Sequence, residues 1–316
     1  MRDAVPDFSA ITAAHTRIRD HVHRTPVMSS VLLNTHTGAD LHFKCENLQK
    51  VGAFKARGAS NAVFGLTDTE AAGGVATHSS GNHGAALAQA AAARGIAAHI
   101  VMPANAPAVK KAAVAAYGGL IIECEPTLAA RERTLERVVA ATGAHVVHPY
   151  ADPRVIAGQG TLALEVLEQV PDLEVIVLPV GGGGLLSGVA LAIKHLRPDV
   201  EVVAAEPEGA DDAFRSFGLG VLQPSVAPRT IADGLLAGLG AINFGIIQRH
   251  VDTILTVSDA EIVQAMRLQW SRLKTVVEPS GAVSFAALLA HPERFRGRRV
   301  VAVISGGNLD LDNLPW

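Results

Sequence analysis

The sequence predicts an α/β fold in which mainly parallel sheet is covered by helices on both faces. From Leu41 onward, apolar runs of strand length alternate with runs of helical periodicity, the pattern of repeated strand–helix units. Glycine-containing segments follow the predicted strands, at the sheet edge where open α/β folds bind their ligands. A chain of 316 residues can form one large domain or two domains that share a cleft.

The expected elements can be placed in order along the chain. An amphipathic helix comes first, because Phe8, Ile11, Ile18 and Val22 recur at helical spacing after Asp7, a suitable cap. The expected strands are 41–45, 74–78, 98–102, 120–124, 145–148, 175–180, 200–205 and 300–304. The expected helices between them include 85–94, 109–117, 128–142 and 185–196. The alanine-rich run 85–93 has side chains small enough for close packing on a sheet.

Composition indicates a small-molecule substrate. Charged residues make up 18% of the chain, and 27 basic against 30 acidic residues give a net charge of −3, so we expect no nucleic-acid partner. The two isolated cysteines, Cys45 and Cys124, make neither a disulfide framework nor a zinc site, which favours the reducing cytoplasm.

No membrane association is expected either. The N-terminus lacks the apolar core of a signal peptide. Residues 175–193 are uncharged and long enough to cross a bilayer, but the four consecutive glycines within them favour strand, turn and helix.

A lysine lies in the stretch 46–58, where a glycine-containing turn gives way to a helix-forming run. Lys55 stands between bulky Phe54 and small Ala56, so its amine could be held at a helix start. A held, partly desolvated lysine becomes a usable nucleophile or base. Taken alone, a solvated surface lysine is the more common interpretation.

A glycine quartet, Gly181, Gly182, Gly183 and Gly184, joins the strand 175–180 to the helix that follows. Backbone amides of such a loop, together with the helix start, favour a phosphate group. A tight turn without a ligand is the plain alternative. A second alternative is a dinucleotide-binding site with Glu206 as its acidic residue. The sequence does not fit the G-x-G-x-x-G motif, however, because Leu186 or Ser187 stands where the motif needs its third glycine.

Two more loops complete a set of four segments: Ser79-Ser-Gly-Asn-His-Gly84 and Ser305-Gly-Gly-Asn308. Together, the four resemble the fold-type II enzymes that use pyridoxal phosphate, in the serine racemase and threonine/serine dehydratase branch, over nearly the whole chain. The resemblance implies a tryptophan synthase β-like fold of two open, mainly parallel sheets flanked by helices. It places the coenzyme between a large domain, 1–73 and 151–316, and a small domain, 74–150, although no composition shift marks these boundaries.

The resemblance also implies coenzyme-binding roles. Lys55 would form the Schiff base and accept the substrate's α-proton, with Phe54 against the ring. Asn82 would meet the 3′-oxygen, and Gly181, Gly182, Gly183 and Gly184 the 5′-phosphate. Ser305 would meet the pyridine nitrogen, where a neutral partner favours β-elimination over transamination.

Substrate-binding roles fall on the serine-rich loop and on one arginine. Ser79, Ser80, Asn82 and His83 would receive the α-carboxylate, and Ser80 would also supply a proton on the face opposite Lys55, permitting racemisation. Arg131 matches a racemase arginine that approaches a second carboxylate, which makes 3-hydroxyaspartate a credible substrate. Where the racemases carry a serine after Thr230-Ile-Ala-Asp-Gly234, this chain has Ala237.

An acidic segment, Glu206-Pro-Glu-Gly-Ala-Asp-Asp212, follows a predicted strand. Oxygen ligands of this kind suit hard divalent cations. The resemblance assigns magnesium or calcium to Glu206, Ala210 and Asp212. An acidic turn in water is the alternative.

The function expected is that of a dehydratase and ammonia-lyase for L-serine, L-threonine or 3-hydroxyaspartate, with serine racemase activity. The alternatives are a 3-hydroxyaspartate ammonia-lyase as the main activity, a cysteine synthase-type β-replacement enzyme, and a nucleotide-binding oxidoreductase or binding protein. The resemblance suggests a homodimer. No segment downstream is long enough for the regulatory domain of allosteric threonine dehydratases, so feedback inhibition is not expected.

Overall fold

The computed structural model describes residues 5–79 and 81–316, and it contains two open sheets. The six-stranded sheet has the order β1-β2-β10-β7-β8-β9, and all its neighbours are parallel except β1 and β2. Its strands are β1 (Val27–Ser29), β2 (Asp40–Cys45), β7 (Val175–Pro179), β8 (Glu201–Pro207), β9 (Thr253–Val257) and β10 (Arg299–Ile304). The four-stranded sheet is wholly parallel, in the order β5-β4-β3-β6. Its strands are β3 (Val75–His78), β4 (Ala98–Pro103), β5 (Leu120–Cys124) and β6 (His145–Val146).

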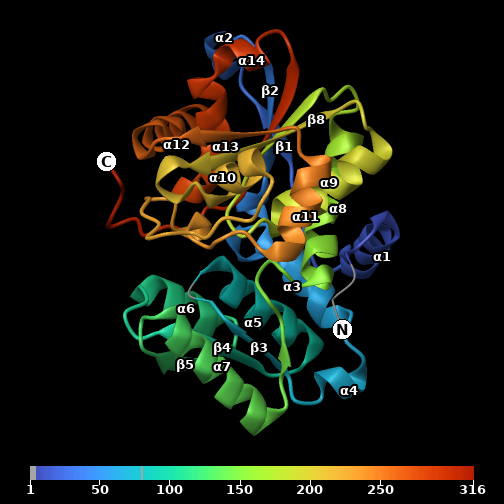
Figure 1. Cartoon of the computed structure of the whole chain (residues 1–316), viewed down its shortest axis with the longest axis vertical. Helices are drawn as coiled ribbons and strands as arrows, with labels where there is room; N and C mark the ends of the chain where they lie inside the picture. Colours follow the sequence, from blue (N-terminus) through green and yellow to red (C-terminus); the bar gives the residue numbers. More distant parts are fainter. Residues whose placement is uncertain (1–4, 80) are drawn as a thin grey trace.

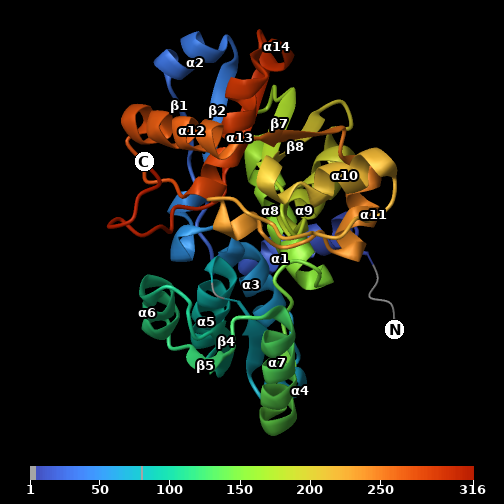
Figure 2. The ribbon, with the colours of Figure 1, turned by 60° about the vertical axis from the view of Figure 1, so that its left-hand side comes forward.

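Helices cover both sheets. They are α1 (Phe8–Ile18), α2 (Val31–Thr37), α3 (Lys55–Phe64), α4 (Asp68–Ala71), α5 (Asn82–Arg94), α6 (Ala108–Ala116), α7 (Leu128–Thr142), α8 (Pro153–Gln169), α9 (Gly184–Leu196), α10 (Asp212–Leu219), α11 (Ala241–His250), α12 (Asp259–Leu273), α13 (Pro279–Ala290) and α14 (Pro292–Phe295). Short 3₁₀ turns are η1 (Glu46–Leu48), η2 (Lys50–Gly52), η3 (Glu208–Ala210) and η4 (Asp233–Leu235). Figures 1 and 2 show the six-stranded sheet and its helices in the upper half of the molecule, and the four-stranded sheet with α5, α6 and α7 in the lower half.

The central strands are buried on both faces, which explains their continuous apolar runs. Along β7, Ile176 and Leu178 face a core shared with α1, α8, α9 and α11. Val175 and Val177 face the opposite core, formed with α12 and α13. Side chains alternate in this way because successive residues of a strand point to opposite faces.

The two halves share part of a core at α3. Ala56, Ala59 and Val63 from this helix pack in the same cluster as Val75 and Ile100 of the small sheet. All four small-sheet strands lie inside residues 74–150, the range predicted for the small domain. Helix α3, although outside that range, therefore contributes to both halves, and it lies where they meet in Figure 1.

Most predicted elements are present, with local differences. The first helix begins after Asp7, whose side chain accepts from Ala10 N at 2.9 Å, as the cap prediction requires. The helix ends at Ile18, so the expectation that it reaches Val22 is wrong; the chain turns there through a hydrogen bond from His21 N to Ile18 O. Strands β1 and β9 were not among the predicted strands; both are edge strands of the large sheet.

The run 175–193 is divided into β7 and α9 by the glycine loop, as predicted. Among the helices of the described residues, none combines the length and apolarity that crossing a membrane requires.

Candidate active site

Lys55 is the first residue of α3, and its position is fixed by the strand end beside it. The preceding residue, Phe54, donates its backbone N–H to Ser305 O at 3.0 Å, and Ala53 forms an isolated bridge with Gly306. The Lys55 amine donates to the carbonyl oxygen of Pro149 at 2.8 Å. Burial of this amine lowers the pKa of Lys55 to about 8, although the residue as a whole is only partly buried. Lys55 thus has the chemistry of a nucleophile or base near neutral pH.

The glycine quartet lies between β7 and α9, as predicted, and side chains would not fit there. A Cβ atom added to Gly181 would lie 2.9 Å from Leu235 Cα, and one added to Gly182 only 2.4 Å from the ring of Tyr150. Gly183 has a φ of 91°, which also favours glycine. Within residues 5–79 and 81–316, no side chain caps the start of α9, so its first amides can receive an anion. This loop fits a phosphate group.

Tyr150 connects the glycine loop to the lysine. It follows Pro149, which accepts the Lys55 amine, and its ring packs on Gly182. Asn243 fixes this arrangement, because its side-chain amide donates to both Tyr150 O at 3.0 Å and Gly182 O at 2.5 Å. Sequence reasoning missed Tyr150 and Asn243. Only the position of Tyr150, just after a predicted strand, could have drawn attention to it.

Asn82 begins α5 and belongs to a second group of polar side chains. Its Nδ2 donates to Glu278 Oε1 at 2.8 Å, and its Oδ1 accepts from Asn308 Nδ2 at 2.9 Å. Glu278 is 4% exposed, and burial raises the pKa of this carboxyl to about 8. A Cβ atom on Gly306 would lie 2.2 Å from Glu278 Oε1, so the glycines after β10 allow this close approach. Sequence reasoning did not identify Glu278; Asn308 was at least part of a recognised segment.

Ser305 ends β10 and is 3% exposed. Its hydroxyl donates to Ser280 O at 3.3 Å, and its carbonyl holds Phe54. The structure therefore brings Ser305 next to the lysine segment, although the two are far apart in the sequence.

Two histidines, His83 and His148, lie near the lysine on the small-sheet side. His83 is 2% exposed, its Nε2 lies 3.2 Å from Val147 O, and burial together with the charge of Lys55 lowers its pKa to about 3. Burial, followed by the charges of His78 and Lys55, lowers the pKa of His148 to about 4. His148 Nδ1 accepts from Ala151 N at 3.0 Å. These imidazoles are therefore neutral at pH 7 and can donate or accept hydrogen bonds.

Ser79 and Arg131, two other predicted substrate residues, also belong to the small-sheet half. Ser79 Oγ accepts from Gly81 N at 3.3 Å. Ser80 lies outside the described residues. Arg131 is on α7, and its Nε atom is buried without a hydrogen-bond partner among the residues that the structure describes. Burial, and after it the charge of Arg131, lowers the pKa of His78, so the guanidinium is near that histidine.

The predicted metal residues lie at the end of β8. Glu206 accepts from Ala213 N at 3.0 Å and from Phe214 N at 2.7 Å, and Asp212 accepts from Leu239 N at 2.8 Å. Burial, with a smaller contribution from the charges of Asp212 and Asp211, raises the pKa of Glu206 to about 8. Two buried carboxylates beside the Ala210 segment fit a hard cation. No cluster of three or more His, Cys, Asp or Glu side chains suited to a metal occurs in the described part of the chain, and the predicted set contains only two.

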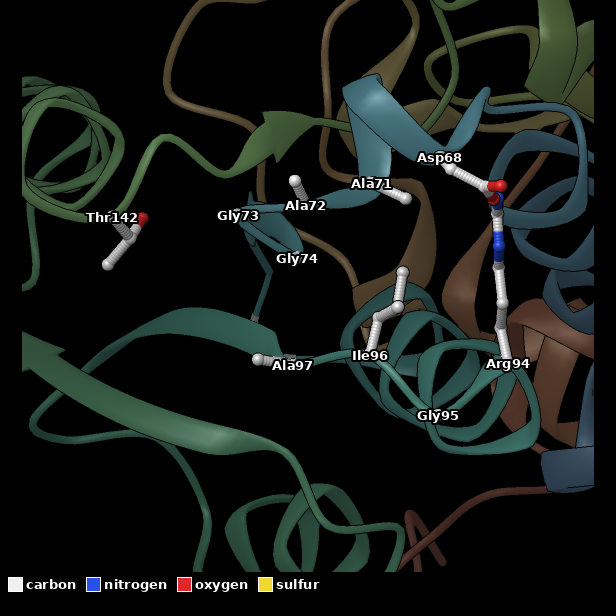
Figure 3. Close-up of a pocket in the computed structure, with 10 residues that line it drawn as sticks. All are labelled: Asp68, Ala71, Ala72, Gly73, Gly74, Arg94, Gly95, Ile96, Ala97 and Thr142. Carbon is white, nitrogen blue, oxygen red and sulfur yellow. The ribbon is translucent and has the colours of Figure 1, made fainter.

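A cavity of about 480 Å³ lies elsewhere (Figure 3). Gly74 and Ala97, which line it, precede β3 and β4, so it opens at the sheet edge opposite the loops described above. Its one cation, Arg94, already contacts Asp68 at 3.1 Å. We assign no function to this cavity.

Comparisons with known proteins agree with this geometry. The sequence matches the family described as pyridoxal-phosphate dependent enzyme over residues 18–306. It is 54% identical over 312 residues to a protein of Paracoccus denitrificans named beta-hydroxyaspartate dehydratase, covering 99% of each chain. It is 48% identical to serine racemase of Arabidopsis thaliana, covering 98% of this chain and 95% of that one. The structure of maize serine racemase superimposes with a TM-score of 0.96 at 46% identity, covering 98% of this chain and 95% of that one.

Proposed function

This chain belongs to the pyridoxal-phosphate-dependent enzymes, in the branch of serine racemases, hydroxyaspartate dehydratases and threonine deaminases, and we propose that it is a dehydratase for β-hydroxy amino acids. The reaction removes the α-proton and the β-hydroxyl, and hydrolysis of the product gives a 2-oxo acid and ammonia. The observation that carries the proposal is the buried Lys55 amine, placed through Pro149 and Tyr150 next to a glycine loop that suits a phosphate.

Pyridoxal phosphate, when bound, stabilises negative charge at the α-carbon of an amino acid joined to it. We assign the coenzyme to the following residues: Lys55, Phe54, Asn82, Gly181, Gly182, Gly183, Gly184 and Ser305. Two features support this fit: the uncapped amides of α9 and the low pKa of Lys55. Ser305, a neutral partner at the end of β10, suits elimination.

Lys55 is the base in this proposal. With a pKa of about 8, a fraction of its amine is neutral at pH 7 to 8 and can accept the α-proton. Pro149 O orients the amine, and the neutral His83 and His148 do not add positive charge that would suppress its basicity further.

We propose 3-hydroxyaspartate as the preferred substrate. Its second carboxylate needs a cation, and Arg131 Nε is buried without a partner among the described residues. A buried, unpaired guanidinium N–H gains most from a charged acceptor. Sequence identity also supports this substrate, because it is 54% to the dehydratase of Paracoccus denitrificans and 48% to the serine racemase of Arabidopsis thaliana.

Two finer assignments accompany this proposal. Ser80 would donate the proton on the face opposite Lys55 and so permit racemisation of serine. Glu206, the Ala210 carbonyl and Asp212 would hold a divalent cation, because this ligand set offers hard oxygen atoms. The range 74–150 would act as the small domain that closes over the substrate.

A substrate panel tests the proposal. The purified enzyme, supplied with pyridoxal phosphate, is given the 3-hydroxyaspartate isomers, L-serine, D-serine and L-threonine, and both 2-oxo acid formation and inversion of serine are measured. We expect oxaloacetate from at least one 3-hydroxyaspartate isomer with the largest kcat/KM of the panel. A larger kcat/KM for serine or threonine would refute the preference, and no 2-oxo acid from any substrate would refute the dehydratase assignment.

A further inference from the structure

Helix α3, which begins at Lys55, also contributes to a group of buried charged residues. The reaction proposed above does not use this group. It consists of Lys44, Glu46, Arg57 and Glu165, here called the charge cluster. The four residues are between 0% and 4% exposed and come from β2, η1, α3 and α8. Two cations and two carboxylates give the cluster no net charge.

Arg57 is its centre, and each side of the guanidinium is bound by a carboxylate. Nε and Nη2 donate to the two oxygens of Glu46, both at 2.8 Å. Nη1 and Nη2 donate to the two oxygens of Glu165 at 2.6 and 2.9 Å. Nη1 also donates to Thr161 Oγ1 at 3.3 Å. All N–H groups of the guanidinium are therefore used, in the planar fork geometry that only arginine supplies.

Lys44 completes the cluster. Its amine donates to Glu165 Oε2 at 2.5 Å, Gln169 Oε1 at 2.9 Å and Thr25 O at 2.8 Å. These are the three bonds that an ammonium group can donate. A closed network of this kind holds its members in one geometry, because moving any member leaves a buried charge unpaired.

Arg57 lies two residues after Lys55 on α3. Residues at this separation are about 200° apart around a helix, so Arg57 leaves the helix on the side away from the Lys55 amine. Before the helix, the Phe54 N–H bond to Ser305 O at 3.0 Å holds the chain on β10, but no side chain of the described residues caps the first turn of α3. Each of the two carboxylates accepts two hydrogen bonds from Arg57. Together they restrict the rotation of α3 about its axis and, with it, the direction of Lys55.

The packing of α3 against α8 also leaves α3 little freedom to shift along or away from its neighbour. A Cβ atom on Gly158 would lie 2.7 Å from Arg57 O and from Gly58 Cα, so α3 and α8 approach each other backbone to backbone at this point. Glu165 is on the same helix α8. Helix α8 thus holds α3 both by close contact and by the charge cluster.

We propose that Arg57, through the charge cluster, is a positioning residue for Lys55. Arg57 directs the Lys55 amine to Pro149 O and to the coenzyme. Loss of the forked hydrogen bonds of its guanidinium therefore alters the reactivity of the Lys55 amine and not only the stability of the fold. The inference rests on the role of Lys55 in the proposed function.

The test compares Arg57→Lys, which keeps the charge and loses the fork, with Val166→Ala. Val166 is next to Glu165 on α8 and fully buried in a different cluster, so its truncation destabilises the same helix without touching the charges. Both holoenzymes are titrated with pH while the absorbance of the lysine-bound coenzyme is followed, and melting temperature, kcat and KM are measured.

For Arg57→Lys we expect the pH midpoint of the coenzyme absorbance to move by at least about half a unit. We also expect kcat to fall by about 10- to 100-fold with KM changed much less, the effect of a misdirected catalytic group. Val166→Ala should lower the melting temperature and leave the midpoint unchanged. Equal midpoints in Arg57→Lys, Val166→Ala and the wild-type enzyme would overturn the proposal.

If Arg57→Lys does not fold, Glu46→Gln replaces it, since the amide keeps the shape of the side chain and weakens one side of the fork. The same midpoint should then move, and an unmoved midpoint would again refute positioning. Because the midpoint is read without substrate, this result is independent of which amino acid the enzyme prefers.

Discussion

Asn82 Nδ2 donates a 2.8 Å hydrogen bond to the buried carboxyl group of Glu278, and this bond joins the small-sheet helix α5 to the start of α13 on the large sheet. The other oxygen of this carboxyl group accepts from the backbone N–H of Asn308 at 3.0 Å. Glu278 therefore holds the side chain that we assign to the coenzyme's 3′-oxygen, and it does so across the line where the two halves of the protein meet.

Glu278→Gln should change how stability depends on pH. Burial raises the pKa of Glu278 to about 8 from its ordinary value of 4.5, so between these values the folded protein keeps a proton that the unfolded chain releases. The stabilisation from this group is complete below pH 4.5 and is lost as the pH rises to about 8.

Glutamine does not titrate, so between pH 5 and pH 8 the unfolding free energy of the variant should rise relative to that of the wild-type enzyme by on the order of 3 kcal/mol. Denaturant unfolding at both pH values measures this difference. A constant difference would mean that Glu278 has an ordinary pKa.

Lys55 should set the pH dependence of coenzyme attachment. Its amine has a pKa of about 8, so the neutral, reactive form becomes the major form above that pH. We expect the rate of imine formation between apoprotein and pyridoxal phosphate to rise through pH 8 and level off by about pH 9. Stopped-flow absorbance over pH 6.5–10.5 measures it, with Lys55→Ala as the unreactive control. A rate that keeps rising beyond pH 10 would indicate an unperturbed lysine.

The sequence identified the residues whose signals are local. Lys55, the glycine quartet and Ser305 each stand at a strand or helix end marked by periodicity and glycine, and parallel sheets bring such ends to one edge. The resemblance of the four segments to fold-type II enzymes predicted the family and the fold correctly.

The missed residues depend on tertiary contacts. Glu278 meets Asn82 across 196 residues of sequence, and nothing in the local pattern of Glu278 points to that partner. Tyr150 became visible only through its packing on Gly182. The charge cluster needed the structure as well, because two glutamates, a lysine and an arginine would normally be expected in water.

Arg131→Ala should reduce selectivity for acidic substrates. If the guanidinium binds the second carboxylate of 3-hydroxyaspartate, its loss should lower kcat/KM for that substrate by about 10- to 100-fold, the effect of a charge-assisted hydrogen bond. The kcat/KM for L-serine, which has no second carboxylate, should change by no more than about twofold.

Arg133→Ala is the matched control, because Arg133 is on the same helix and exposed. Its selectivity should equal that of the wild-type enzyme. An equal loss for both substrates in Arg131→Ala would remove Arg131 from the specificity site.

Removal of divalent cations should destabilise the protein. A cation bound by Glu206 and Asp212 at 100 times its dissociation constant adds about 2.7 kcal/mol of stability, worth about 5 °C in melting temperature. We expect EDTA to lower the melting temperature by that amount and added Mg²⁺ or Ca²⁺ to restore it. Glu206→Gln should abolish this response, whereas Glu208→Gln, at an exposed position two residues on, should retain it. No response in the wild-type enzyme would remove the metal from the proposal.

Gly182→Ala should weaken coenzyme binding more than it weakens the fold. The added Cβ would lie 2.4 Å from the ring of Tyr150, so the ring or the loop must move, and the amides at the start of α9 would lose their common direction. We expect at least about a 100-fold rise in the dissociation constant for pyridoxal phosphate, equivalent to about 2.7 kcal/mol, measured by fluorescence titration of the apoprotein. Gly218→Ala is the control, since a Cβ there would have no atom of the described residues within 4 Å and alanine suits a helical position of α10. If both variants bind the coenzyme as the wild-type protein does, the quartet is only a turn, and the phosphate must be bound elsewhere.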